Sequence, residues 1–154
     1  MKFSRIKIAR QGNFILGLFL IYFLFFGFIC LNFIRDLYGQ LDIGDRLLLL
    51  NQILFNPNTF WSFIILFGIM FFIASRESFY EYAIRNSIWY IPAIMIMSWF
   101  WYWILYGFDP TVFYIYFIQI EGYLTILSLL CINLFAVILA SSITEKRKEL
   151  RTLE

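Results

Sequence analysis

Four long stretches of this chain carry no charged side chain and are built mainly from Phe, Ile, Leu, Trp and Tyr. A helix rises about 1.5 Å per residue, so an uncharged helix of about 20 residues matches the roughly 30 Å hydrocarbon core of a bilayer. We therefore predict an all-α polytopic membrane protein. Its four transmembrane helices are expected at about residues 14–34, 57–75, 87–106 and 123–143.

The overall composition supports the same class. Hydrophobic residues make up 62% of the 154 residues, charged residues make up 14%, and the mean hydropathy is +0.80. Soluble domains are roughly half apolar and one quarter charged, so a water-soluble core is excluded. The sequence contains no internal repeat and no linker between domains, and residues 1–154 are predicted to form a single membrane domain.

Prolines and glycines suggest where the helices begin, bend and end. Pro57 suits the first position of the second span, and Pro92 is expected to bend the third span because it removes one backbone hydrogen bond. Gly122 is expected to act as a hinge before the last span. Short interfacial helices are predicted at residues 45–55, along the outer membrane surface, and at residues 111–121.

The basic residues are distributed very unevenly between the two sides of the predicted spans. Two of them, Arg35 and Arg46, fall on one side. The ten on the other side are Lys2, Arg5, Lys7, Arg10, Arg76, Arg85, Lys146, Arg147, Lys148 and Arg151. Loops rich in Lys and Arg remain on the cytoplasmic side, so both termini are predicted to lie inside. The basic inner side is also expected to attract phospholipids.

Aromatic residues fall near the predicted ends of the spans. Trp89 lies toward an inner end, and Trp61, Trp103 and Tyr106 lie at outer ends, as expected for interface anchors. One interpretation of the aromatic run from Trp99 to Trp103 is a binding site for a quinone or pigment. Its indoles do not share one helix face, however, so anchoring and packing are the favoured interpretation.

Several kinds of chemistry lack the residues that they require. The chain contains no histidine, and haem, copper and catalytic zinc sites depend mainly on histidine. It also has no Gly-rich phosphate loop and no nucleophile elbow. Cys30 and Cys131 are expected at different depths, which argues against a disulfide bond. We therefore expect no catalytic activity in this chain alone, no metal, no cofactor other than bound lipid, and no nucleic-acid partner.

A few polar or small residues remain as functional candidates. Glu121 is either a solvated rim residue or, if the last crossing begins near Val112, an intramembrane carboxylate for protons or ions. Asn133, Ala136 and Ala140 share one helix face that is suited to packing against another transmembrane helix. The apolar segment 112–120 has little polar surface on any face. If it lies outside the bilayer it needs cover from a partner protein or from the membrane surface.

The choice of apolar residues carries a further indication. Phe, with twenty residues, and Ile are abundant while Ala and Val are scarce, as an A+T-rich coding sequence would produce. In composition the chain resembles organelle-encoded respiratory-chain membrane subunits of protists. Residues Ile120-Glu121-Gly122-Tyr123 are similar to the Glu-bearing helix of the smallest core membrane subunit of respiratory complex I. The next helix of that family, with its second Glu, has no counterpart here.

This resemblance implies a non-catalytic subunit of a respiratory or other energy-transducing membrane complex, with other membrane subunits as partners. It favours the mitochondrial inner membrane, and a bacterial plasma membrane is the alternative. Two other functions stay open. One is a transporter or channel component in which Glu121 and Asn133 line a proton or ion path. The other is a small membrane assembly or immunity factor.

Overall fold

The computed structural model describes residues 2–34, 47–77 and 79–152, of which 2–10 and 146–152 are described as backbone only. All regular structure in this part of the chain is helical, which confirms the all-α prediction. The elements are α1 (Lys2–Phe19), the π-helical turns η1 (Leu20–Gly27) and η2 (Cys30–Ile34), α3 (Leu49–Phe55), α4 (Ser62–Arg76), α5 (Tyr80–Tyr106), α6 (Val112–Ile118) and α7 (Ile120–Thr152).

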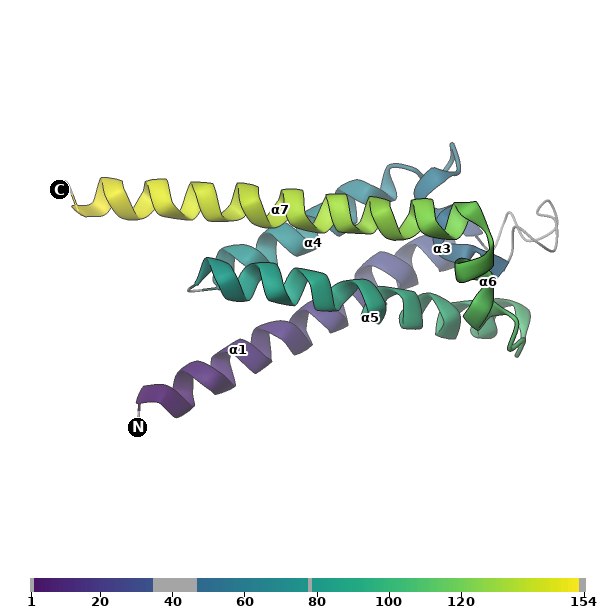
Figure 1. Cartoon of the computed structure of the whole chain (residues 1–154), viewed down its shortest axis with the longest axis horizontal. Coiled ribbons are helices and arrows are strands. Elements are labelled where there is room, and N and C mark those ends of the chain that lie inside the picture. Colours follow the sequence, from purple (N-terminus) through teal and green to yellow (C-terminus); the bar gives the residue numbers. More distant parts are fainter. Residues whose placement is uncertain (1, 35–46, 78, 153–154) are drawn as a thin grey trace.

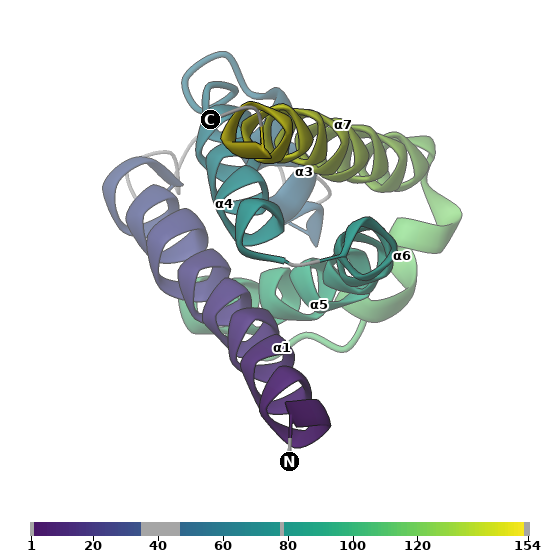
Figure 2. The ribbon, with the colours of Figure 1, turned by 90° about the vertical axis from the view of Figure 1, so that its left-hand side faces the viewer.

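The long helices form a bundle in which successive helices run in opposite directions (Figure 1). Both chain termini lie at one end of the bundle, named here the terminal end, and α3 and α6 lie at the opposite, distal end. Viewed from the terminal end, α4 lies between α1 and α7 (Figure 2). Helix α4 packs most extensively on α7, which also packs on α5.

Three helices in the described residues are long and apolar enough to cross a membrane. They are Gln11–Ile34, Tyr80–Tyr106 and Ile120–Glu145, with mean hydropathies of 2.8, 1.4 and 2.5. These helices indicate an integral membrane protein, but only three helices of the described residues reach this length, where four spans were expected. Helix α4 has only 15 residues, so it is about 22 Å long and falls short of a roughly 30 Å hydrocarbon core.

The second expected span is shortened by a turn at its start. Asn56 has an extended backbone, and its Oδ1 accepts a hydrogen bond from the Asn58 N–H at 3.0 Å. Pro57 therefore lies in a turn, and the helix does not begin until Ser62. Asn56 caps a local turn here because its side chain competes with the helix for backbone donors.

Helix α5 begins at Tyr80 and not at residue 87 as expected, because the residues before the predicted span already continue the same helix. Pro92 lies within the continuous helix, at an exposed position. The helix ends at Tyr106 because Gly107 adopts a φ of 93°, which glycine tolerates more readily than other residues.

Helix α3 contradicts the expected surface helix at residues 45–55. Leu49, Leu50 and Ile53 are almost completely buried, and α3 packs on α4, α5 and α7 within the distal end of the bundle. Insertion removes these apolar side chains from water, which stabilises the distal end more than a surface position would. Asp45 and Arg46, expected to begin this helix, lie outside the described residues.

The break between α6 and α7 falls at Gln119, earlier than the expected hinge at Gly122. Gln119 has extended dihedral angles, and α7 begins at the next residue. Gly122 serves another purpose, because a Cβ atom at this position would collide with the backbone of Tyr116. The glycine therefore allows the first turn of α7 to fold back closely on α6.

Candidate functional site

The helix face predicted from Asn133, Ala136 and Ala140 lies inside the bundle, and all three residues are fully buried. Asn133 Nδ2 on α7 donates a hydrogen bond to the carbonyl oxygen of Ser87 on α5, at 3.1 Å. Asn133 Oδ1 has no hydrogen-bond partner among the described residues.

The small side chains of this face let neighbouring helices approach closely. Ala140 and Val137 on α7 pack in one apolar cluster with Ala74 of α4 and Ala83 of α5. Small residues at such positions permit close backbone packing, which drives helix association in membranes. Together with the bond from Asn133, this cluster joins α4, α5 and α7.

Glu121 lies apart from this face, in the exposed first turn of α7. Its carbonyl oxygen accepts hydrogen bonds from Asn51 Nδ2 at 3.1 Å and from Thr125 Oγ1 at 2.7 Å. Glu121 and Asn133 are separated by about 18 Å along the helix axis, at about 1.5 Å per residue. The structure therefore does not bring the two predicted polar residues into one site.

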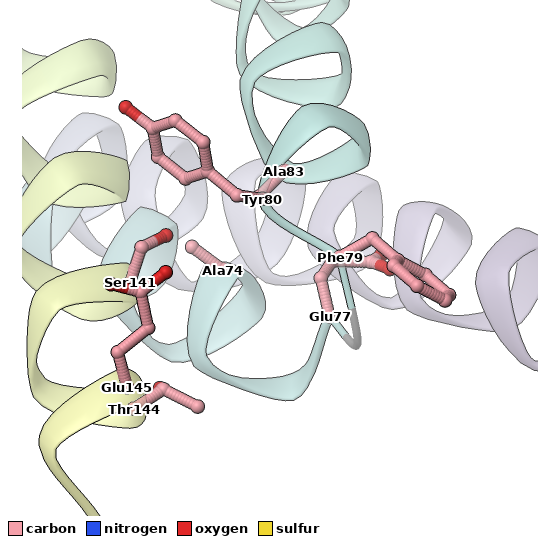
Figure 3. A pocket seen from close by; sticks show the side chains of 8 residues that line it. All are labelled: Ala74, Glu77, Phe79, Tyr80, Ala83, Ser141, Thr144 and Glu145. Carbon is pink, nitrogen blue, oxygen red and sulfur yellow. The ribbon is translucent and has the colours of Figure 1, made fainter. Parts of the chain in front are cut away.

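A polar crevice of about 50 Å³ opens at the terminal end, where α4 and α5 meet α7 (Figure 3). Tyr80 extends from the start of α5 toward α7, and Ser141 and Glu145 project from α7 on the opposite side. Glu77 in the α4–α5 turn accepts a hydrogen bond from Asn86 Nδ2 at 3.3 Å. The other residues that line the crevice are Ala74, Phe79, Ala83 and Thr144.

Sequence reasoning missed Glu77 and Asn86. Both lie between the predicted spans 57–75 and 87–106, and only an α5 that begins at Tyr80 brings Asn86 back beside the α4–α5 turn. The available signal was a carboxylate and an amide at the two ends of this connecting segment. A further void of about 10 Å³ adjoins the crevice near Ser87 and Val137, which is room for about one water molecule.

The predicted anchors occupy both parts of the bundle. Trp61 at the distal end donates from Nε1 to the Asn58 carbonyl oxygen at 3.0 Å. Trp103, in the last turn of α5, donates to the Asp109 carbonyl oxygen at 3.1 Å, and Tyr106 ends the same helix. Trp89 is exposed in the half of α5 nearer the terminal end.

The aromatic run of α5 forms the docking surface for α6. The ring centroids of Trp99 and Trp103 lie 5.0 and 5.3 Å from that of Phe113, in perpendicular arrangements. Trp101 is buried instead against Tyr22, with 5.5 Å between the centroids. The indoles thus contribute to packing in two different directions.

Backbone and side-chain hydrogen bonds connect the distal elements. The buried Tyr116 hydroxyl of α6 accepts a hydrogen bond from the Leu50 N–H of α3 at 3.1 Å. Asn51 Nδ2 also donates to Thr125 Oγ1 of α7 at 3.0 Å. In the turn before α6, Asp109 Oδ1 accepts hydrogen bonds from Thr111 Oγ1 and N, which lower the pKa of Asp109.

The described part of the chain holds no group of three or more His, Cys, Asp or Glu residues that is suited to a metal ion. Cys30 is buried and Cys131 is exposed, and neither forms a disulfide bond with a described residue. Among the described residues, the remaining polar candidates for a functional site are therefore those at the helix contacts and in the crevice.

Comparison with known proteins finds no matching protein-family model, no similar curated protein and no similar solved structure.

Proposed function

We propose that this chain is a non-catalytic integral membrane subunit of a larger membrane assembly. A respiratory or other energy-transducing complex is the favoured setting, in the mitochondrial inner membrane or, alternatively, in a bacterial plasma membrane. Its role is to scaffold neighbouring helices and to seal them against lipid. The observation that carries this proposal is an apolar surface at the distal end of the bundle.

This distal apolar surface consists of Tyr114, Phe117, Ile118 and Ile120, which are 51%, 55%, 67% and 71% exposed. Val112 and Tyr116 bury the opposite face of α6 against the bundle. The surface lies on α6 and the start of α7 at the distal end of the bundle, beside the last turns of α5. Contiguous exposed apolar patches mark interaction sites, and here a partner subunit is the proposed cover.

The direction of the helices supports a defined threading through the membrane. Because α1 and α5 run the same way, α4 has to return the chain between them (Figure 1). We propose that α4 makes a short crossing inside the bundle, since local thinning of the bilayer accommodates a short apolar helix. With this threading, the excess of basic residues supports an orientation in which the terminal end faces the cytoplasm or matrix.

The polar residues within the bundle favour scaffolding over catalysis. Asn133 bonds a backbone carbonyl of a neighbouring helix, and the adjacent alanines pack against α4 and α5. Groups of this kind hold membrane helices together. The function that they support is mechanical, and the exposed sides of the long helices supply the contacts with lipid.

Extraction in a mild detergent, followed by native electrophoresis and mass spectrometry, tests the proposal. We expect the chain to migrate with other membrane subunits. The substitutions Phe117→Gln and Ile118→Gln should release it from them, while Phe60→Gln should not. Phe60 is a suitable control because it is an exposed aromatic residue in the turn before α4, outside the distal apolar surface. A wild-type chain at monomer mass without other subunits would refute the proposal and favour a free-standing assembly or immunity factor.

A transport component is the second candidate, and one observation favours it. Asn133 Oδ1 is buried without a partner among the described residues, and the polar crevice with Glu77 opens from the terminal end toward the same three helices. The test is ion or proton flux through the purified chain in liposomes. If such flux occurs and is lost in Asn133→Leu and in Glu77→Gln, the transport function replaces the scaffold proposal. Flux that depends on Glu121 instead would point to the path expected from the sequence.

A further inference from the structure

A groove of about 550 Å³ runs between α1 and α5 in the terminal half of the bundle. Its lining residues are Gln11, Phe14, Ile15, Arg85, Asn86 and Trp89. Its volume falls in the range of roughly 300–1,000 Å³ that is typical of small-molecule sites. The groove is separate from the polar crevice, which lies between α4, α5 and α7.

The floor of the groove is apolar and held in place by packing. The rings of Phe14 on α1 and Tyr90 on α5 stack with 4.8 Å between centroids, and the Tyr90 hydroxyl donates to the Phe14 carbonyl oxygen at 3.1 Å. Gly17 permits this approach, because a Cβ atom there would collide with the Tyr90 hydroxyl. Beside this fixed contact, the side chains of Ile15 and Trp89 are exposed.

The rim of the groove is polar and carries a cation. Arg85 is exposed one helical turn before Trp89, and its guanidinium lies 4.9 Å from the centre of the Tyr82 ring. Gln11 on α1, the first residue of the apolar span Gln11–Ile34, supplies an exposed amide. Cationic and amide donors thus meet the apolar floor at the level where a long apolar helix begins.

We propose that this groove binds one anionic phospholipid. Arg85 and the Gln11 amide receive the phosphate of the headgroup, and the upper part of an acyl chain lies along Phe14, Ile15 and Trp89. A guanidinium favours a phosphate because it presents several N–H donors in a planar fork. A zwitterionic headgroup is disfavoured, since its ammonium group would lie near the same guanidinium.

The combination of floor and rim selects a lipid over a free anion. A soluble phosphate would use the rim but would leave the apolar floor uncovered, so it would forgo most of the available binding energy. The position also agrees with a site at the inner leaflet, where basic residues attract anionic lipids. The proposal requires only that the chain resides in a bilayer, and it is independent of the assembly role proposed above.

Native mass spectrometry of the full chain in detergent with equal amounts of phosphatidylglycerol and phosphatidylcholine tests this site. We expect one retained phosphatidylglycerol, with the preference over phosphatidylcholine reduced about fivefold in Arg85→Gln and largely kept in Arg85→Lys. Arg76→Gln is the matched control. Arg76 is also exposed at the terminal end and also lies over a ring one turn earlier, that of Phe72 at 5.6 Å, but it is not part of the groove.

A second measurement follows the acyl chain. Phosphatidylglycerol brominated on its acyl chains should quench the fluorescence of Trp89, and Trp89→Phe should remove that part of the quenching. Equal retention of both lipids, an equal loss of preference in Arg76→Gln, or displacement of the lipid by millimolar inorganic phosphate would overturn the proposal. Circular dichroism of each variant separates loss of binding from loss of fold, because both arginines are exposed.

Discussion

Asn133 Nδ2 on α7 donates a hydrogen bond to the Ser87 carbonyl oxygen on α5 across 3.1 Å. Both residues are buried, and the bond joins helices that are far apart in sequence. Such bonds between transmembrane helices contribute about 0.6 kcal/mol on average and up to about 1.7 kcal/mol. The bond therefore specifies how the helices fit together more than it stabilises them.

Replacement of Asn133 should reveal this balance. Asn133→Leu removes the bond but also removes the Oδ1 atom that has no partner among the described residues. We expect the free energy of unfolding to change by less than about 1 kcal/mol. Asn133→Asp should destabilise the bundle by several times more, because it places an ionisable group at a fully buried position. Equilibrium unfolding in mixed detergent micelles measures both changes, and equal effects would contradict the account.

Ala140 tests the close packing of α7 on its neighbours. Ala140→Leu inserts a larger side chain among Ala74, Ala83 and Val137, and should cost about 1–3 kcal/mol of stability. Ile138→Leu, at an exposed position of the same helix, should change stability by less than about 0.5 kcal/mol. Thermal unfolding followed by circular dichroism compares the two. An Ala140→Leu variant as stable as the control would show that the helices have room to separate.

Gly17 tests the contact that forms the floor of the groove. Gly17→Ala should destabilise the bundle because the added Cβ atom would displace the Tyr90 hydroxyl and push α1 away from α5. Gly12→Ala provides the control, since nothing lies within 4 Å of its position and alanine favours a helix by about 1 kcal/mol. Detergent-induced unfolding should shift in opposite directions for the two variants. A shift in the same direction would argue against the α1–α5 register.

Tyr116 tests the insertion of α3. Tyr116→Phe removes the acceptor for the buried Leu50 N–H and should cost about 1–3 kcal/mol. Tyr114→Phe on the same helix changes an exposed hydroxyl and should have little effect. Hydrogen exchange read by mass spectrometry should show faster exchange at residues 49–55 in the first variant alone. Unchanged protection there would mean that α3 is held by its apolar contacts without this bond.

The turn before α6 should respond to acid. The pKa of Asp109 lies below its ordinary value of 3.8 because Thr111 donates two hydrogen bonds to the carboxylate. Because the pKa of Asp109 is lower in the folded state than in the unfolded state, the ionised carboxylate stabilises the turn at pH values above the unfolded-state pKa. This stabilisation is lost as the pH falls through the folded-state pKa. The emission of Trp103, whose indole bonds the Asp109 carbonyl oxygen, reports the change.

Asp109→Ala supplies the comparison for this pH dependence. At neutral pH the variant should already show the altered Trp103 emission that the wild-type chain acquires only below about pH 4. Thr111→Val should behave in the same way, because it removes one of the two donors. An acid transition of the same size in Asp109→Ala and in the wild-type chain would assign the change to another group.

Several features of the fold were predictable from local sequence. Hydropathy located the long apolar helices, and the spacing of Asn133, Ala136 and Ala140 placed them on one helix face that the structure buries. Local rules were less successful at boundaries. Pro57 was expected at the start of a helix, but the helix begins only at Ser62. The Asn56 side chain accepts a hydrogen bond within a turn instead, and hydropathy carries no information about such a turn.

The sequence by itself determined the class of the protein, since the length and hydropathy of a helix are sums over neighbouring residues and require no knowledge of distant partners. Only the tertiary structure decided which apolar segment is buried in the protein and which faces outward. It inserted α3 into the distal end, brought Glu77 beside Asn86, and aligned Gly17 with Tyr90 so that a groove with Arg85 at its rim lies between α1 and α5. Each of these outcomes depends on contacts between residues far apart in the chain or on the exact residue at which a helix starts. The local hydropathy of a segment does not show whether it is buried against another helix.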